Sequence, residues 1–115
     1  MERALSGCVL QSSRASLELA RGDRRILATV GVHPHDAALI ADPDGTLTAA
    51  AREVLAQLRD LATAAEVVAI GEIGLDFHRD LSPRPAQDTA LRRQLELAAE
   101  LDLPVVFHIR DAYPE

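Results

Sequence analysis

The stretch Val67-Val68-Ala69-Ile70-Gly71-Glu72 decides the fold of this chain, because a run of apolar residues passes directly into a glycine and a carboxylate. Such a run predicts a buried strand over residues 67–70 that delivers Glu72 to its carboxyl end. Strands of parallel sheets are buried on both faces. Because an unpaired carboxylate is costly there, we expect Glu72 to meet a metal ion, an arginine or strong hydrogen-bond donors.

Strands and helices alternate on both sides of this stretch. Short apolar runs predict three further strands, at residues 6–11, 26–32 and 105–108. Capping residues and apolar residues at intervals of three and four predict helices from Ser12 and Ser13 to about Gly22, over residues 47–65 and over residues 86–101. This alternation predicts an α/β fold of about four parallel strands with right-handed crossovers, in a single domain over residues 1–115.

Composition limits the classes of function. The chain has 115 residues, 48% of them hydrophobic, and a net charge of −6, which gives no support for a broad basic surface that binds nucleic acid. A nuclease that works through divalent metal ions is still compatible with this charge, because bound cations invert it locally. The single cysteine, Cys8, is expected to be a small core residue, and it fits a reducing cytoplasm. No long apolar segment predicts a membrane span or a signal peptide.

Ionisable residues follow the predicted strands, where parallel α/β folds gather their function. Glu72 and His108 are each the first strongly polar residue after a strand, so they face one site if the two strands pair. A carboxylate and an imidazole suit zinc, manganese or a similar ion. Alternatively, Glu72 forms an ion pair with Arg110, and His108 is a hydrogen-bonded residue at a strand end.

Two further residues near these strand ends have two interpretations each. Asp76, in the loop expected after Glu72, either orients a histidine or activates a metal-bound water, or it accepts backbone N–H groups as a loop cap. Arg110 either binds a phosphate oxygen through its planar fork or neutralises Glu72.

The remaining histidines are weaker candidates. His33 and His35 flank Pro34, and they form either a two-histidine metal site or a surface loop with half-exposed rings. His78 is expected to be solvated. Since the sequence has no Gly-x-Ser-x-Gly elbow, phosphate loop, dinucleotide fingerprint or zinc-cysteine pattern, nucleophilic catalysis by serine or cysteine has no support.

Three segments, in order and suitably spaced, resemble successive signatures of the TatD family of metal-dependent hydrolases. They are Gly-Val-His-Pro-His at residues 31–35, Ala-Ile-Gly-Glu-Ile-Gly-Leu-Asp-Phe at residues 69–77 and Leu-Pro-Val-Val-Phe-His-Ile-Arg-Asp-Ala at residues 103–112. The resemblance implies a TIM-type (β/α) barrel with one or two divalent metal cations. It also implies that the substrate partner is DNA, whose phosphodiester bonds a metal-activated water hydrolyses. The sequence predicts no membrane partner, and it gives no basis for naming a protein partner.

The resemblance also assigns roles to single residues. Glu72 resembles the carboxylate that contacts the metals, and His108 resembles a histidine ligand. His33 resembles a residue that lines the substrate mouth. Asp76 and Arg110 occupy motif positions close to the catalytic site.

Part of the family's ligand set lies outside this sequence. The first-strand His-x-His pair and a later histidine and aspartate have no counterpart here, and His33 and His35 match a different motif. Because a complete barrel needs about 250 residues, the chain is expected to be an internal fragment covering roughly strands 2 to 5, with weak or no nuclease activity. The alternatives are a related metallohydrolase acting on an amide or lactone and a degenerate, non-catalytic fragment.

Overall fold

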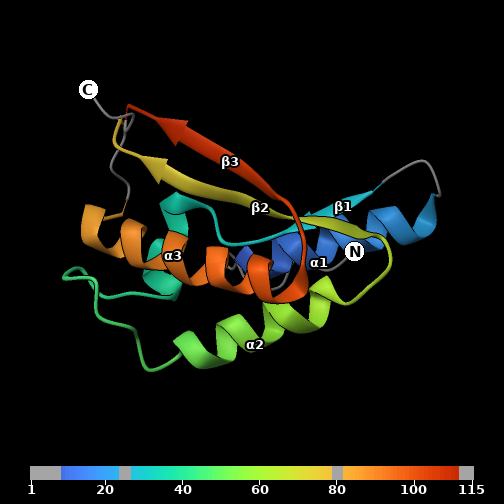
Figure 1. Cartoon of the computed structure of the whole chain (residues 1–115), viewed down its shortest axis with the longest axis horizontal. Helices are drawn as coiled ribbons and strands as arrows, with labels where there is room; N and C mark the ends of the chain where they lie inside the picture. The colour runs from blue at the N-terminus through green and yellow to red at the C-terminus, as the bar shows by residue number, and fades with distance from the viewer. Residues whose placement is uncertain (1–8, 24–26, 79–81, 112–115) are drawn as a thin grey trace.

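The chain folds into a parallel sheet with helices packed against it. The computed structural model describes residues 9–23, 27–78 and 82–111. Its elements, in chain order, are α1 (Val9–Gly22), β1 (Ala28–Val30), the 3₁₀ helix η1 (Pro34–Leu39), α2 (Ala51–Ala62), β2 (Val67–Asp76), α3 (Arg84–Leu101) and β3 (Val105–Arg110) (Figure 1). The sheet has the order β1-β2-β3, and both neighbouring pairs are parallel. The α/β class is therefore confirmed, with three strands in the described part of the chain where about four were predicted.

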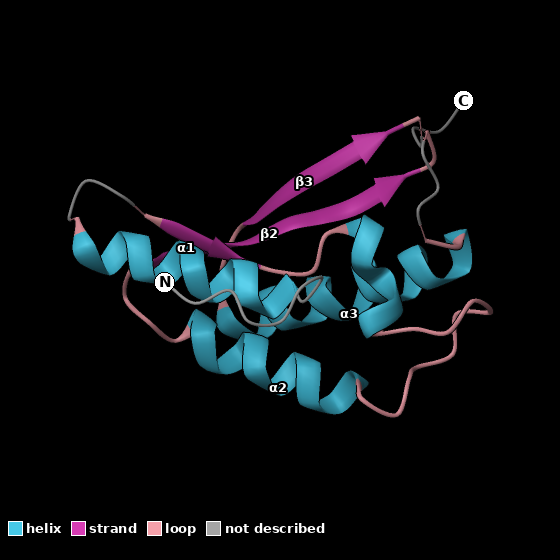
Figure 2. Cartoon of the chain, turned by 180° about the vertical axis from the view of Figure 1, so that it is seen from behind, coloured by secondary structure: helices cyan, strands magenta, loops and turns pink. Residues whose placement is uncertain are grey.

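The core lies between the sheet and the helices on one side of it. α2 and α3 lie on the same side of the sheet in the front view and in the view from behind (Figures 1 and 2). Leu58 of α2 belongs to the same buried cluster as Ile70 and Ile73 of β2, and all three side chains are 0% exposed. Many of the other buried residues are alanines, which let helices approach the sheet closely because they have no side chain beyond Cβ: Ala20, Ala28, Ala37, Ala62, Ala86, Ala90 and Ala98.

β2 is longer than predicted, because two glycines keep it against β3. A Cβ at Gly71 would lie 2.7 Å from the Cβ of Val106, and a Cβ at Gly74, whose φ is +149°, would collide with the carbonyl oxygen of His108. Without these side chains the ladder continues to the pair Asp76 and Arg110. The predicted strand end after residue 70 is therefore wrong. Glu72 lies within β2, and Asp76 is its last residue, not a loop residue.

The predicted strand at residues 6–11 is also wrong where the structure describes it. Residues 9–11 form the first turn of α1, and residues 6–8 lie outside the described part of the chain. A short apolar run does not distinguish a strand from a buried helix. Ser13 lies inside the helix and caps nothing. Its hydroxyl oxygen accepts the N–H of Gly31 at 3.1 Å, which fastens α1 to the segment after β1.

The other helices agree more closely with the sequence. α3 begins at Arg84 with Pro85 in its first turn and ends at Leu101, as expected. α2 is shorter than the helix predicted over residues 47–65. It begins only at Ala51, because Leu47 pairs with Ala41 in an isolated antiparallel bridge. Among the described residues, no helix combines the length and the apolar character needed to cross a bilayer.

Candidate functional site

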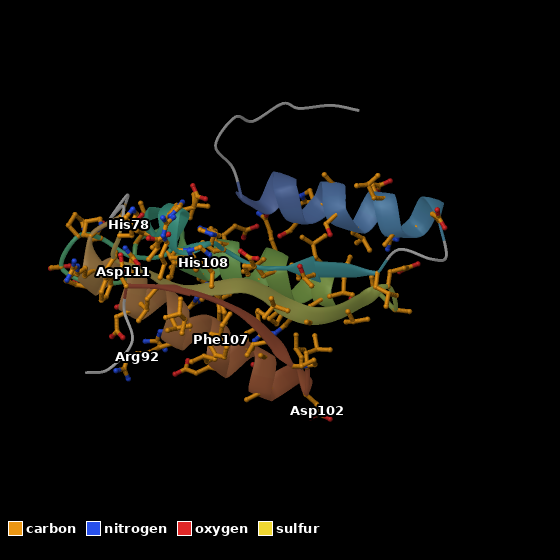
Figure 3. All side chains as sticks on the ribbon, turned by 90° about the horizontal axis from the view of Figure 1, so that it is seen from above. His78, Arg92, Asp102, Phe107, His108 and Asp111 are labelled. Atoms are coloured by element: carbon orange, nitrogen blue, oxygen red, sulfur yellow. The ribbon has the colours of Figure 1, made fainter. Side chains whose placement is uncertain are left out.

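The histidines and carboxylates meet at the carboxyl end of the sheet. Seen from above, His78, His108 and Asp111 lie toward one end of the strands, whereas Asp102, at the end of α3, lies at the other (Figure 3). His33 and His35 join the same end from the segment that follows β1. Parallel strands bring the residues at their carboxyl ends to one edge, as the sequence predicted.

His33 directly precedes η1 as its N-cap residue, and its ring caps that helix. Its backbone is extended, with φ −64° and ψ 149°, and Pro34 occupies the first helical position. The Nδ1 of His33 accepts the backbone N–H of His35 at 3.2 Å. A neutral imidazole that accepts through Nδ1 has its proton on Nε2. The Nε2–H of His33 therefore points toward Glu72, whose Oε1 lies 3.7 Å away.

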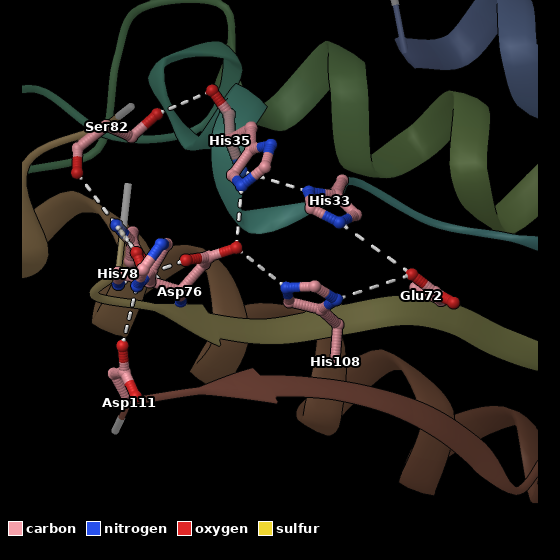
Figure 4. Close-up of polar contacts among 9 residues, drawn as sticks. His33, His35, Glu72, Asp76, His78, Ser82, His108 and Asp111 are labelled. Atoms are coloured by element: carbon pink, nitrogen blue, oxygen red, sulfur yellow. Dashed lines mark hydrogen bonds and ion pairs between the residues drawn. The ribbon is translucent and has the colours of Figure 1, made fainter. Parts of the chain in front are cut away.

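Asp76 is the buried anchor of the site. It is 0% exposed, and its Oδ2 lies 2.8 Å from Nε2 of His35 and 2.8 Å from Nε2 of His108 (Figure 4). The other oxygen, Oδ1, accepts the backbone N–H of His78 at 3.1 Å. A buried carboxylate requires such donors because its desolvation is costly. Asp76 thus fixes the orientation of rings that come from two different segments.

His108 lies between two carboxylates. Its Nε2 contacts Asp76, and its Nδ1 lies 3.8 Å from Oε1 of Glu72. Because a carboxylate only accepts, the Nε2–H of His108 donates to Asp76, and in the tautomer protonated on Nε2 alone the lone pair lies on Nδ1, which faces Glu72. The ring centroid of His33 is 4.6 Å from that of His108, so both rings face the same carboxylate.

Burial keeps His33 neutral. Desolvation lowers the pKa of His33 below its ordinary value, and repulsion from His35 and His108 lowers it further. Glu72 and Asp36 act in the opposite direction but do not reverse the shift. His33 is therefore a neutral hydrogen-bond donor near pH 7.

The site has the donor atoms of a metal centre. One ring nitrogen from each of His33, His35 and His108 lies within 4.8 Å of the others. In this structure Nδ1 of His33 already accepts the N–H of His35, so His33 supplies a ligand nitrogen less readily than His108 does. Glu72 adds a carboxylate oxygen beside two of the rings, and its side chain is 52% exposed. Imidazole and carboxylate groups in this arrangement suit a zinc, manganese or similar ion.

The predicted site residues come together with one exception. His33, Glu72, Asp76 and His108 form one cluster, whereas Arg110 lies two residues beyond His108 on the exposed end of β3. The structure gives no ion pair between Arg110 and Glu72, both of which it describes, so that interpretation of Glu72 is wrong. The expectation for His78 is confirmed, because its side chain is 51% exposed where it meets Asp111.

Sequence reasoning left the role of His35 undecided and gave no role to two glutamines. The i, i+2 spacing with His33 was the available signal for His35, but a surface loop fitted it equally well. Gln87 and Gln94 are fully buried on α3. Their signal was a pair of amides seven residues apart in a helix, on the same face as the apolar residues.

Comparison with known proteins agrees with this geometry. A family model described as TatD related DNase matches residues 2–115. The 3′-5′ ssDNA/RNA exonuclease TatD of Enterobacter lignolyticus is 45% identical over 109 residues, which are 95% of this chain and 38% of that protein. The protein of the same name from Cronobacter sakazakii is 45% identical over 94% of this chain and 37% of its own length.

A solved structure extends the agreement to three dimensions. The crystal structure of YJJV, a TatD homolog from Escherichia coli K12, matches with a TM-score of 0.70 and 32% identity over 89% of this chain and 36% of that chain. The parallel α/β fold is thus part of a TIM-type barrel, as predicted. The chain spans less than two fifths of the length of these relatives.

Proposed function

The chain belongs to the TatD family of related DNases, and from that premise we propose that its site serves metal-dependent hydrolysis of phosphodiester bonds in nucleic acid. Two relatives are named 3′-5′ ssDNA/RNA exonucleases, so the proposed substrate is single-stranded DNA or RNA. The proposed compartment is the cytoplasm, because a chain with a single cysteine fits a reducing environment.

The position of His108 between Asp76 and Glu72 is the observation that supports this proposal most strongly. Histidines that bind metals usually donate their second ring N–H to a carboxylate, which fixes the tautomer and raises the basicity of the ligating nitrogen. His108 has this arrangement, with Nε2 at 2.8 Å from Asp76 and Nδ1 facing Glu72. Asp76 is then the positioning carboxylate, and His108 is the ligand.

The distances at Glu72 fit a shared ion. Zinc binds imidazole nitrogen and carboxylate oxygen at about 2.0–2.2 Å, so two ligands of one ion lie within roughly 4 Å of each other. Oε1 of Glu72 lies 3.8 Å from Nδ1 of His108. Glu72 and His108 would therefore hold the divalent cation. A cation bound there would polarise a phosphoryl oxygen and make water a better nucleophile at neutral pH.

The residues around these ligands would bind the substrate. The Nε2–H of His33 is a neutral donor at the edge of the site, where a phosphate oxygen can accept it. Arg110 follows His108 by two residues on β3, which places both on one face of the strand. Its exposed guanidinium is available for the planar, two-point pairing that phosphates favour.

Binding and cleavage of a labelled oligonucleotide test this function. We expect the full chain to bind a short single-stranded DNA in the presence of Mn²⁺, measured by fluorescence anisotropy, and to lose that binding in EDTA. Slow, Mn²⁺-dependent shortening of the 5′-labelled strand from its 3′ end would support the exonuclease reaction. Binding and cleavage that are the same with and without Mn²⁺ would contradict the proposal. Faster turnover of chromogenic amides or lactones would favour the other metallohydrolase class.

A further inference from the structure

Two buried glutamines on α3 contact the backbone of the site segments. Gln87 and Gln94 are both 0% exposed. A primary amide is costly to bury unless its polar atoms find partners, so each glutamine must be fully hydrogen-bonded. Seven residues separate them, which is about two helical turns, and both therefore lie on the same face of α3.

Gln94 binds the segment that leads into His33. Its Oε1 accepts the N–H of Val32 at 2.6 Å, and its Nε2 donates to the carbonyl oxygen of Val32 at 3.1 Å. Val32 lies beyond the last residue of β1, Val30. The side-chain amide of Gln94 therefore satisfies both the backbone N–H and the backbone C=O of Val32. Within a sheet, a neighbouring strand would make these hydrogen bonds.

Gln87 makes the same two-point contact with Asp76. Its Oε1 accepts the N–H of Asp76 at 2.8 Å, and its Nε2 donates to the carbonyl oxygen of Asp76 at 3.2 Å. The same Nε2 also donates to the carbonyl oxygen of Ser82 at 2.8 Å, which ties the start of α3 to the end of β2.

We propose that Gln87 and Gln94 are positioning residues, which fix the backbone of Asp76 and of Val32 and thereby the imidazoles of the site. The inference rests on the proposed function, because the residues that the two glutamines position are those proposed to bind the metal and the substrate. The side chain of Asp76 orients His108 through a bond of 2.8 Å, so a displacement of the Asp76 backbone moves the ring directly. Val32 immediately precedes His33, so Gln94 fixes the ring that faces the substrate.

The two amides therefore have different effects. Gln87 acts on Asp76 and His108, and its loss weakens metal binding. Gln94 acts on His33, which is not among the assigned ligands, and its loss mainly weakens the binding of the oligonucleotide. These different effects distinguish positioning from general support of the fold. If the two glutamines only supported the fold, the loss of either would weaken metal binding and oligonucleotide binding to the same extent.

Methionine substitutions in the full chain test the proposal. Q87M and Q94M keep the length of the side chain and remove all its hydrogen bonds. The first control is L97A, which removes a buried apolar side chain (3% exposed) from α3 but none of the hydrogen bonds to Val32 or Asp76. The second control is Q57M, which removes a half-buried amide on α2 that hydrogen-bonds with the side chains of Arg14 and Glu53. Mn²⁺ affinity by calorimetry, oligonucleotide affinity in Mn²⁺ and urea stability are measured for every variant.

We expect Q87M to weaken Mn²⁺ binding by about tenfold or more, as for other residues that orient metal ligands. Q94M should keep Mn²⁺ binding close to that of the wild type and lose oligonucleotide affinity. L97A should lose stability and keep both affinities. Wild-type Mn²⁺ affinity in Q87M, or a loss in L97A equal to that in Q87M, would overturn the proposal.

Hydrogen exchange of the wild-type chain gives a readout that needs no metal and no variant. The amide protons of Val32 and Asp76 should exchange as slowly as those within the β2–β3 ladder, because buried glutamine oxygens accept them. Exchange of these two amides as fast as in exposed loops would overturn the proposal. Because this measurement uses the wild type, it decides the matter even if Q87M does not fold. If the wild type binds no Mn²⁺ but these amides are protected, the proposed function fails and the positioning of the two segments stands.

Discussion

The carboxylate of Asp76 lies 2.8 Å from Nε2 of His108, and this contact determines which ring nitrogen of His108 faces the open side of the site. Asp76 is the last residue of β2 and His108 lies within β3, so the contact also joins the two longest-paired strands of the sheet. One buried oxygen atom thus joins two strands and orients the ring that we propose as a metal ligand.

Replacing Asp76 with asparagine should destabilise the protein. Hydrogen bonds to a charged acceptor contribute about 1.5–3 kcal/mol, and asparagine removes the charge that His35 and His108 share. We expect D76N to lower the free energy of unfolding in urea by about that amount. D88N is the control, because Asp88 forms an exposed ion pair with Arg92 on α3, and such pairs contribute at most about 1 kcal/mol. Equal stability of D76N and D88N would count against the role of Asp76.

Alanine at Gly74 should separate β3 from β2. The new Cβ would collide with the carbonyl oxygen of His108, and φ of +149° is unfavourable for any residue with a side chain. We expect G74A to cost about 2–5 kcal/mol of unfolding free energy from steric overlap and backbone strain together.

Gly22, at the end of α1, provides the control for that substitution. Apart from the adjacent residues and the backbone of α1 itself, no atom lies within 4 Å of a Cβ built at Gly22. G22A should therefore change the stability by about 1 kcal/mol or less. If G74A unfolds at the same urea concentration as G22A, close contact at Gly74 does not limit the approach of the strands.

The stability should fall in mild acid, partly because of His33. Burial, then repulsion from His35 and His108, holds the pKa of His33 below its ordinary value, against the opposing effect of Glu72 and Asp36. The unfolded chain therefore takes up a proton at higher pH than the folded chain does. The contribution is present above the ordinary pKa of histidine and is lost as the pH falls through the lower, folded-state value.

Urea unfolding at about pH 7.5 and about pH 5.5 measures this contribution. The wild type should lose more stability between the two values than H33N does, because asparagine does not titrate. An identical loss in both proteins would show that His33 takes no part in the pH dependence.

The sequence predicted the alternation of strands and helices and the gathering of Glu72, Asp76 and His108, because apolar runs and their polar ends follow directly from burial. It did not predict where β2 ends. Gly71 and Gly74 have the properties of residues that end a strand, yet here they allow the close approach of β3 that prolongs it. Glycine indicates backbone freedom or lack of bulk, and the local sequence does not distinguish the two.

The hydrogen-bond network of the site could not be predicted either, because the local sequence does not determine contacts between distant segments. Which nitrogen of His108 meets Asp76, and that His35 meets it too, depends on the register of segments far apart in the chain. Gln87 and Gln94 lie on the core-facing side of a helix, where apolar residues are the ordinary expectation. Their roles depend on backbone groups of other segments, which no helical pattern reveals.

Metal titration of the variant E72Q tests most directly the central claim, which is that Glu72 and His108 hold a divalent cation. Calorimetry with Mn²⁺ compares the wild type, E72Q and the matched control E96Q, in which an exposed carboxylate on α3 is neutralised. If Glu72 and His108 hold the cation, the wild type and E96Q bind Mn²⁺ with the same affinity, and E72Q binds it about tenfold more weakly or not at all. Equal binding by E72Q and the wild type, or no binding by the wild type, would contradict the account.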